Sequence, residues 1–292
     1  MNIALNSDYL KSTGSPEIFL RLMAEAGFSH LHWCHQWNTD YIYTSSEINM
    51  YKHWLKEFGI VLLDIHGSAG MEKCWWSEVD YCRRAGVELV LNRIQMFDAL
   101  EGEGCIMMHM PCFQYGVDIA PIQRTHFEAV KRSLDELVPA LEKYNTKIAV
   151  ENMFDDTFET ISGIMNEYPA EYVGITYDSG HGNINTARGA ENMETWKSRL
   201  QALHLNDNNG SGDLHQPPFY GTVDWERAAK MIAGSSYTDR PASFELSIAN
   251  TPFMQPGLRE NIDEKPLRKF LADAYERCAK VATAIEKYRA LI

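Results

Sequence analysis

Acidic and imidazole side chains occur in this 292-residue chain directly after short apolar runs that are typical of β-strands. The runs are VLLDIH, CIMMH, KIAVE, VGITYD, ALHL and ASFE, and the residues concerned are His66, His109, Glu151, Asp178, His204 and Glu245. If the strands lie parallel, their carboxyl ends open on one face of the sheet. Carboxylates and imidazoles are ligands of divalent cations. The pattern therefore predicts a metal site at that face.

Three further candidate ligands follow two of these strand ends. Asp178 begins the sequence DSGH, so His181 lies three residues later and reaches the same face if the chain turns back at the glycine. The loop after ALHL contains DLH, with Asp213 and His215 two residues apart. Side chains two apart in an extended segment point the same way, so both can bind one ion. We expect additional ligands here.

A solvated loop residue is the simplest interpretation of any single acid at a strand end. Glu151 and Glu245, however, each follow an apolar strand on a different part of the chain. Burying an unpaired carboxylate is unfavourable unless a cation or hydrogen bonds compensate. The pair therefore favours one cation between the two carboxylates.

Strand-like and helix-like segments alternate along the whole chain without a composition break. This alternation, and a length that fits one barrel of about 250 residues with modest loops, predicts a single (β/α)8 TIM barrel and one domain over residues 1–292. The expected strands span 3–6, 30–34, 61–66, 105–109, 147–151, 172–178, 200–205 and 242–247. The expected helices span 15–27, 45–59, 72–100, 125–144, 158–168, 196–200, 222–232 and 264–291.

Helix punctuation supports this division. Ser15 is expected as an N-cap with Pro16 at the first helical position, and Gly27 and Gly59 are expected just past two helix ends. Asp224 in GTVDW is expected to cap the following helix rather than take part in chemistry.

Composition limits the environment and partners. The formal net charge of −13 argues weakly against a nucleic-acid partner, because phosphate chains bind clustered Lys and Arg. The cations found after the third, fourth and sixth expected strands are Lys73, Arg124 and Arg188, and none occurs between His204 and Asp224. No run suggests a signal peptide or a membrane span, and six cysteines form no CxxC pair, so we expect a cytoplasmic protein with reduced thiols.

These motifs together resemble the xylose-isomerase-like TIM barrels, the superfamily that includes endonuclease IV and many sugar isomerases and epimerases. The resemblance covers nearly the whole chain and rests on ENM, TYDSGH, HLND, DLH, GTVDW and FEL. In sugar epimerases of this group four residues bind one divalent ion, which implies Glu151, Asp178, His204 and Glu245 here. Endonuclease IV has nine ligands for three zinc ions, which additionally implies His66, His109, His181, Asp213 and His215.

The resemblance leaves two enzymatic functions open. The first is a metal-dependent isomerase or epimerase of a sugar or related hydroxy-carbonyl compound, acting through an enediolate. Glu151 and Glu245 would exchange the proton and His181 would orient an oxygen of a small carbohydrate-like substrate. Aromatic and imidazole residues near other strand ends would line the substrate or simply pack: Trp33, His35, Trp37, Phe113 and Phe154.

The second function is an endonuclease IV-like phosphodiesterase with two or three ions, which explains His66, His109, Asp213 and His215 more directly. The scarcity of loop cations argues against it and favours an unphosphorylated substrate under the first hypothesis. Ketose epimerases of this group have an Arg shortly after the metal-binding His, and this chain has none after His204. Classical xylose isomerases have a Lys soon after the first metal-binding Glu, and this chain has none after Glu151. A non-catalytic binding barrel is the third interpretation.

The sequence leaves the metal and the oligomeric state open. Five imidazoles favour zinc if all nine ligands bind ions, whereas manganese, magnesium or cobalt suits a single site with three carboxylates and one His. We therefore expect one to three divalent ions. A homo-oligomer is compatible with the sequence.

Overall fold

Eight parallel β-strands alternate with eight α-helices in the computed structural model, which describes residues 1–11, 14–111, 120–153, 158–184 and 189–292. The strands are β1 (Ile3–Asn6), β2 (His30–Trp33), β3 (Val61–His66), β4 (Ile106–His109), β5 (Ile148–Glu151), β6 (Val173–Asp178), β7 (Leu200–His204) and β8 (Ala242–Phe244). The helices are α1 (Glu17–Glu25), α2 (Ser45–Phe58), α3 (Asp80–Ala99), α4 (Ala120–Lys143), α5 (Glu159–Glu167), α6 (Gly189–Trp196), α7 (Trp225–Ala233) and α8 (Glu264–Arg289).

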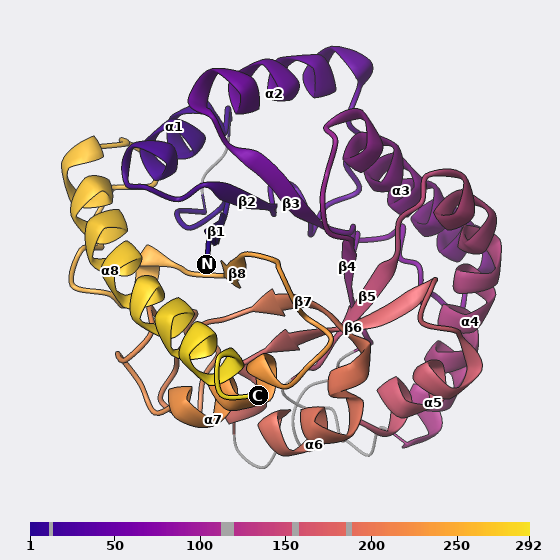
Figure 1. The fold of residues 1–292 in the computed structure, drawn as a ribbon. Helices are drawn as coiled ribbons and strands as arrows, with labels where there is room; N and C mark the ends of the chain where they lie inside the picture. Colours follow the sequence, from indigo (N-terminus) through magenta and orange to yellow (C-terminus); the bar gives the residue numbers. More distant parts are fainter. Residues whose placement is uncertain (12–13, 112–119, 154–157, 185–188) are drawn as a thin grey trace.

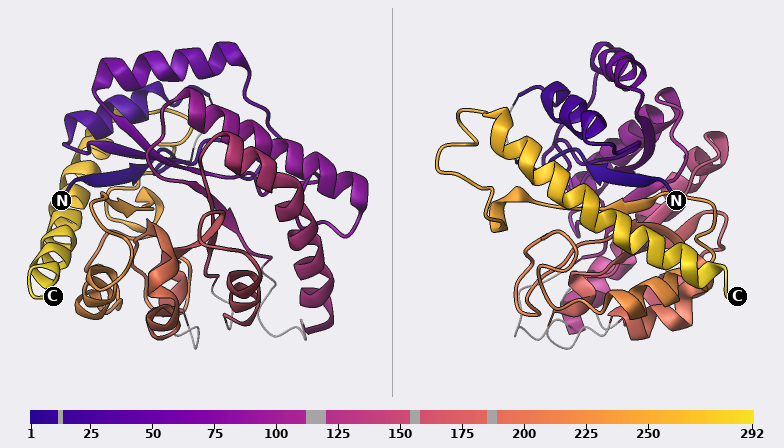
Figure 2. Two further views of the ribbon diagram at one scale, coloured as in Figure 1. Left: turned by 45° about the vertical axis from the view of Figure 1, so that its right-hand side comes forward. Right: turned by 60° about the vertical axis from the view of Figure 1, so that its left-hand side comes forward.

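The strands form one sheet that curls into a barrel. Their order is β7-β6-β5-β4-β3-β2-β1-β8, and a parallel bridge between Leu205 and Phe244 brings the two end strands together. The helices surround the strands in a ring (Figure 1). Among them, α8 contacts α1 and α7 and runs along the outside of the barrel past the N-terminal strand (Figure 2). The prediction of a (β/α)8 barrel is confirmed.

The barrel has an apolar layer outside the strands and a polar interior near their carboxyl ends. Alternate residues of a strand face opposite sides of the sheet. In β2, Trp33 packs against Tyr51 of α2 with ring centroids 4.6 Å apart. His32, the preceding residue, faces inward and lies 4.2 Å from the ring of His204 on β7. This alternation places both the core and the functional side chains.

Most element predictions agree with the structure, but several boundaries were wrong. Helix α4 begins at Ala120, five residues before its expected start. Residues 72–79 precede α3, which begins only at Asp80. The expected helix 196–200 is a single 3₁₀ turn, Lys197–Arg199, after α6, and Leu200 already pairs in the sheet. The strand expected to reach residue 247 ends at Phe244. The middle of α3, GVELVL, is helical as predicted.

Helices α2 and α7 have side-chain or glycine caps, whereas the N-cap residues of α1, α3 and α5 form no side-chain cap hydrogen bond. Gly59 caps α2 in the left-handed region with φ of 69°, and the Asp224 side chain accepts the N–H of Arg227 at the start of α7. Ser15 is not the N-cap of α1: Pro16 holds that position, and the Ser15 hydroxyl accepts the N–H of Glu17 at 3.3 Å. Within the described ranges, no helix combines the length and apolar composition needed to cross a bilayer.

Candidate metal centre

The six strand-end residues converge at the carboxyl end of the barrel. Five of them are the last residues of β3 to β7, and the sixth directly follows β8: His66, His109, Glu151, Asp178, His204 and Glu245. The parallel register brings neighbouring ends level, since His109 pairs with Glu151 and Asp178 pairs with His204. The strand pattern thus positions these side chains without any long loop.

Four buried side chains form the central group: Glu151, Asp178, His204 and Glu245, which each place a ligand atom within 4.8 Å of the others. The Nδ1 atom of His204 lies 3.0 Å from a Glu151 oxygen and 2.9 Å from a Glu245 oxygen. Asp178 is oriented by Asn206, whose amide donates to its Oδ2 at 2.8 Å. Oxygen and nitrogen atoms of one cluster therefore surround a common point.

A second group shares Glu151 with the first. His66, His109 and Glu151 also have ligand atoms within 4.8 Å of one another. The Nε2 atoms of the two histidines are 3.2 Å apart, and His109 Nε2 is 3.0 Å from Glu151 Oε2. His66 Nδ1 donates to the carbonyl of Gly67 at 2.8 Å, which leaves the Nε2 lone pair directed at the centre.

A third group joins the loops after β6 and β7. His181, on a 3₁₀ turn after β6, lies with Nε2 3.5 Å from Asp213, and His215 Nε2 is 2.9 Å from the other oxygen of the same carboxylate. The three residues meet the same 4.8 Å limit. The D-x-H spacing thus brings Asp213 and His215 together, as expected. His215 adopts φ of 47°, an uncommon backbone conformation for a residue other than glycine.

Histidines favour the charged form of two of the three central carboxylates, Glu151 and Glu245. Burial opposes ionisation of Glu151 and Glu245, but the neighbouring histidines hold the pKa of both carboxyls well below the usual range. Burial raises the pKa of Asp178 to about 7, with His181 opposing the shift and the Glu151 carboxylate reinforcing it. Burial also opposes the positive charge of His204, yet Glu151 and Glu245 raise its pKa well above the usual value.

The donor set fits divalent cations. Glu151, Asp178 and His204 are completely buried. In the described chain, the ion-pair partners found for the two acids, Glu151 and Asp178, are histidines rather than Lys or Arg. His204 Nε2 lacks a hydrogen-bond partner despite its burial, and Glu151 Oε2 faces His109 Nε2 at 3.0 Å. Three carboxylates held this close repel one another, and a cation among them would remove that repulsion.

The expected substrate-contacting residues have different positions. Trp33 is fully buried and donates its indole N–H to Tyr43 at 2.9 Å, so its side chain belongs to the outer core. His35 is partly exposed and lines a cavity at the strand-end face. Trp37 lines the same cavity and stacks on His66 with ring centroids 4.2 Å apart. Phe113 and Phe154 lie outside the described residues.

That cavity, of about 540 Å³, contains two cations that the sequence analysis did not assign to the mouth. Lys11 follows β1 and Arg259 follows β8, and both side chains are exposed. Asp8 and Glu260 also line the cavity and balance their charge. Lys11 and Arg259 were missed because their loops carry no other candidate residue near them in sequence.

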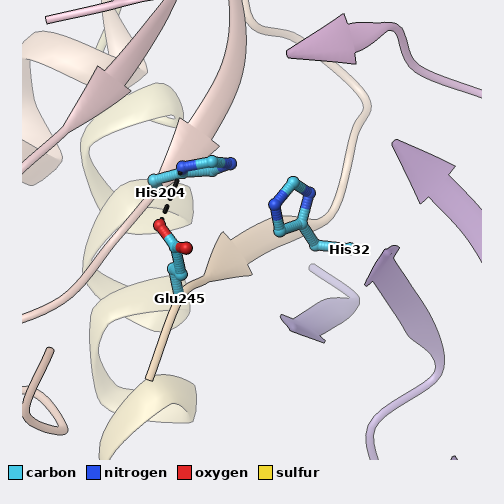
Figure 3. A group of neighbouring side chains, drawn as sticks. All are labelled: His32, His204 and Glu245. Carbon is cyan, nitrogen blue, oxygen red and sulfur yellow. Dashed lines mark ion pairs between the residues drawn. The ribbon is translucent and has the colours of Figure 1, made fainter. Parts of the chain in front are cut away.

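The sequence analysis also missed two polar residues inside the strands. His32 in β2 and Asp64 in β3 are buried in the barrel interior, with His32 Nδ1 2.5 Å from Asp64 Oδ1. The His32 ring points toward His204 and Glu245 (Figure 3). The available signal was the polar residue two positions before a strand end, as in VLLDIH, because positions two apart face the same side.

Known proteins share both sequence and fold with this chain. It is 29% identical over 284 residues to the uncharacterised protein y4fM of Sinorhizobium fredii, covering 89% of this chain and 91% of that protein. A structure described as a D-tagatose 3-epimerase-like protein superposes with a TM-score of 0.73 at 18% identity, over 98% of this chain and 99% of that chain. The IolI protein with a bound zinc atom superposes at 0.64 and 14% identity, over 99% of each chain.

The sequence model described as xylose isomerase-like TIM barrel matches residues 20–278. The match includes seven of the eight strands and the nine candidate ligands. The barrel and the structural likenesses agree with it. This chain therefore belongs to the xylose isomerase-like TIM barrel family.

Proposed function

We propose that this protein is a divalent-metal-dependent isomerase or epimerase of a sugar or related hydroxy-carbonyl compound. The observation that carries the proposal is the pair of carboxyl groups of Glu151 and Glu245, which flank His204 Nδ1 at 3.0 and 2.9 Å in the buried central group. The likeness to a D-tagatose 3-epimerase-like protein supports the choice of reaction.

The central group would hold the cation through Glu151, Asp178, His204 and Glu245. A divalent cation bound there supplies Lewis acidity, which polarises a carbonyl and makes the neighbouring C–H more acidic. Three carboxylates and one imidazole suit manganese, magnesium, cobalt or zinc.

The two glutamates provide the proton chemistry. One carboxylate takes the proton from the carbon next to the carbonyl, and the C–H electron pair moves toward the carbonyl oxygen. The other glutamate, after taking up a proton from solvent, returns it to carbon, and the first gives the proton it took back to solvent, so that the substrate is isomerised or epimerised with no net change in protons. Because histidines keep the pKa of each glutamate low, the one that takes the proton begins the reaction as a base.

His181 is suited to orient a substrate oxygen. Its backbone N–H donates to Asp178 at 2.7 Å, and its Nδ1 lies 3.1 Å from the carbonyl of Asn152. These contacts hold the ring beside Glu151, whose oxygen is 3.6 Å from Nδ1. An imidazole held in this way can donate to a hydroxyl or carbonyl oxygen of the substrate.

The adjoining cavity supports an unphosphorylated carbohydrate as the substrate. Trp37 offers an aromatic wall next to His66, and His35 contributes a polar group at the same wall. Lys11 and Arg259 are balanced by two acids, so the cavity as a whole does not select an anion. A tight complex with a sugar phosphate but not with the free sugar would contradict this part of the proposal.

Exchange of a substrate C–H with solvent tests the reaction. The protein, loaded separately with zinc, manganese, magnesium or cobalt, would be incubated with free aldoses and ketoses in D₂O, and deuterium incorporation followed by NMR. Glu151→Gln and Glu245→Gln are each expected to slow exchange by about 10²–10⁴-fold, the usual contribution of general acid–base catalysis. Glu103→Gln, which changes an exposed carboxylate that pairs with His30, is the control.

Metal-dependent phosphodiester hydrolysis is the second candidate. The gathering of His66 and His109 around Glu151, and of Asp213 and His215 around His181, favours it because each group can bind a further ion. The additional ions would compensate for the few cations at the strand-end face.

Metal content distinguishes the two candidates. Elemental analysis of protein purified without added metal or chelator would be compared with the double variant Asp213→Ala and His215→Ala. Two or three ions per chain, with one lost in the variant, would favour phosphodiesters and abasic DNA as substrates. One ion that the variant retains would remove the basis for the second candidate.

A further inference from the structure

His32 and Asp64 form a buried dyad beneath the central group that the proposed reaction does not use. His32 is completely buried and Asp64 is 1% exposed. His32 Nδ1 lies 2.5 Å from Asp64 Oδ1, so the ring hydrogen is on Nδ1 and is donated to the carboxylate. In the neutral ring the lone pair is then on Nε2, which has no hydrogen-bond partner in the structure.

His204 has the complementary group, a ring N–H without an acceptor. Its Nδ1 atom faces the carboxylates of Glu151 and Glu245, so Nδ1 is the nitrogen available to a cation. With Nδ1 bound, the ring hydrogen is on Nε2. That atom is also buried and has no hydrogen-bond partner. Leaving such a buried donor unsatisfied is unfavourable.

The two rings adjoin inside the barrel. Their centroids are 4.2 Å apart, with an angle of 61° between the planes. One ring nitrogen of His32, one of His204 and one oxygen of Glu245 lie within 4.8 Å of one another. Figure 3 shows the His32 ring directed at His204 and Glu245. The nearest other imidazole is His66, whose ring centroid lies 6.0 Å from His32.

We propose that His32, held by Asp64, is the positioning residue for His204: when a cation is bound at His204 Nδ1, the two Nε2 atoms, both unpaired in this structure, form a hydrogen bond in which His32 accepts the Nε2–H of His204 and keeps His204 Nδ1 toward the cation. Histidines that bind metals commonly donate their other N–H to an acceptor, which fixes the ring orientation and tautomer. Here the acceptor would be a second histidine, itself fixed by a carboxylate. The inference rests on the metal-binding part of the proposed function and is independent of the substrate.

Zinc affinity of the full-length protein, measured by competition with a chromophoric chelator, tests the dyad. His32→Leu removes the acceptor and is expected to weaken zinc binding by about 10–100-fold, as loss of such partners usually does. His32→Gln keeps an acceptor oxygen and is expected to retain more affinity. Asp64→Leu releases His32 and is expected to weaken binding, with no additional loss in the double variant with His32→Leu.

The control is His30→Leu. It removes another buried histidine from the same strand, but His30 contacts Ser29 and Glu103 rather than the metal centre. Circular dichroism and thermal unfolding of the metal-free variants would separate lost folding from lost affinity. Equal zinc affinity in wild type, His32→Leu and Asp64→Leu would overturn the proposal.

Cobalt spectra address direct ligation. A positioning role leaves the ligand set unchanged, so the visible Co²⁺ bands of His32→Leu at saturation are expected to match those of wild type. A changed coordination number would instead make His32 a ligand and overturn the positioning role. If wild-type protein bound no divalent cation, both this inference and the proposed function would fail; loss of the dyad effect alone leaves the proposed function intact.

Discussion

The buried carboxylates of the central group require positive charge close to them. Glu151, Asp178 and Glu245 share one buried region and are stabilised by His181, His204 and His215, whose pKa values are raised. The imidazolium groups therefore stand in electrostatically for bound metal. Because a cation requires neutral imidazoles and deprotonated carboxylates, metal and protons compete at these residues.

Metal binding is expected to release protons at neutral pH. For His215, burial opposes the charge, but Glu245 and Asp213 raise the pKa to about 10, so the metal-free ring is protonated at pH 7. A raised pKa means that the proton must be displaced, and affinity therefore rises as pH increases from 7 toward 10. Each proton released gives about a tenfold gain per pH unit.

Calorimetric titration with zinc in buffers of different ionisation enthalpy measures this release. His215→Ala is expected to release fewer protons than wild type. Zinc affinity that is independent of pH between 7 and 9 would contradict the assignment of charged imidazoles to the metal-free protein.

At the scale of elements, short strands and well-capped helices place the site. Each of β3 to β7 ends at a candidate ligand, so the point at which the strand ends sets the position of that side chain at the open end of the barrel. The helices outside contribute stability, and within the described residues the side-chain partners found for the central ligands lie on strands, loops and the 3₁₀ turn at His181. Changes in their caps and close contacts should therefore alter stability and leave metal binding unchanged.

Loss of the α7 cap is one such change. The Asp224 side chain accepts the N–H of Arg227 at 3.0 Å, and Asp224→Ala is expected to lower the free energy of unfolding by about 1 kcal/mol. Urea denaturation measures the loss, and zinc titration of the same variant is expected to match wild type. Asp224→Ser retains a capping oxygen and serves as the control.

Gly86 in α3 illustrates a close contact. A Cβ atom there would lie 2.4 Å from the backbone nitrogen of Trp75, so Gly86→Ala is expected to destabilise the protein by about 1–3 kcal/mol although Ala favours helix. In Gly163→Ala the added atom meets the far end of the Phe127 ring at 2.8 Å, which can move. A smaller loss for Gly163→Ala is the expected contrast; equal effects would refute it.

For the whole molecule, bound metal should stabilise the barrel. The candidate ligands come from β3 to β8 and the loops after β6 and β7, so a cation would link most of the sheet. Free zinc at 100 times its Kd would add about 2.7 kcal/mol to the free energy of unfolding. Thermal unfolding with zinc and with chelator measures the difference.

The matched variant for this measurement is His204→Ala, which removes the imidazole that contacts both glutamates. Its melting temperature is expected to depend much less on zinc than that of wild type. An equal zinc-dependent shift in both proteins would place the stabilising ion elsewhere.

The sequence by itself determined the barrel and the nine candidate ligands. Apolar runs of strand length alternate with helical segments, and parallel strands bring their ends together whatever the loops do. Residues such as Glu151 and His204 could thus be assigned to one mouth from their positions alone. Element boundaries were less certain, as at the start of α3 and the end of β8, because tertiary pairing decides where a strand or helix stops.

Only the tertiary structure decided which side of each strand faces the interior. In a parallel barrel both faces are buried, so alternation separates two sets of side chains without saying which set faces inward. Trp33 therefore seemed available to substrate but lies in the outer core, whereas His32 and Asp64 meet inside. The approach of Lys11 and Arg259 across one cavity likewise depends on loops from opposite ends of the chain, whose proximity arises only when β1 pairs with β8.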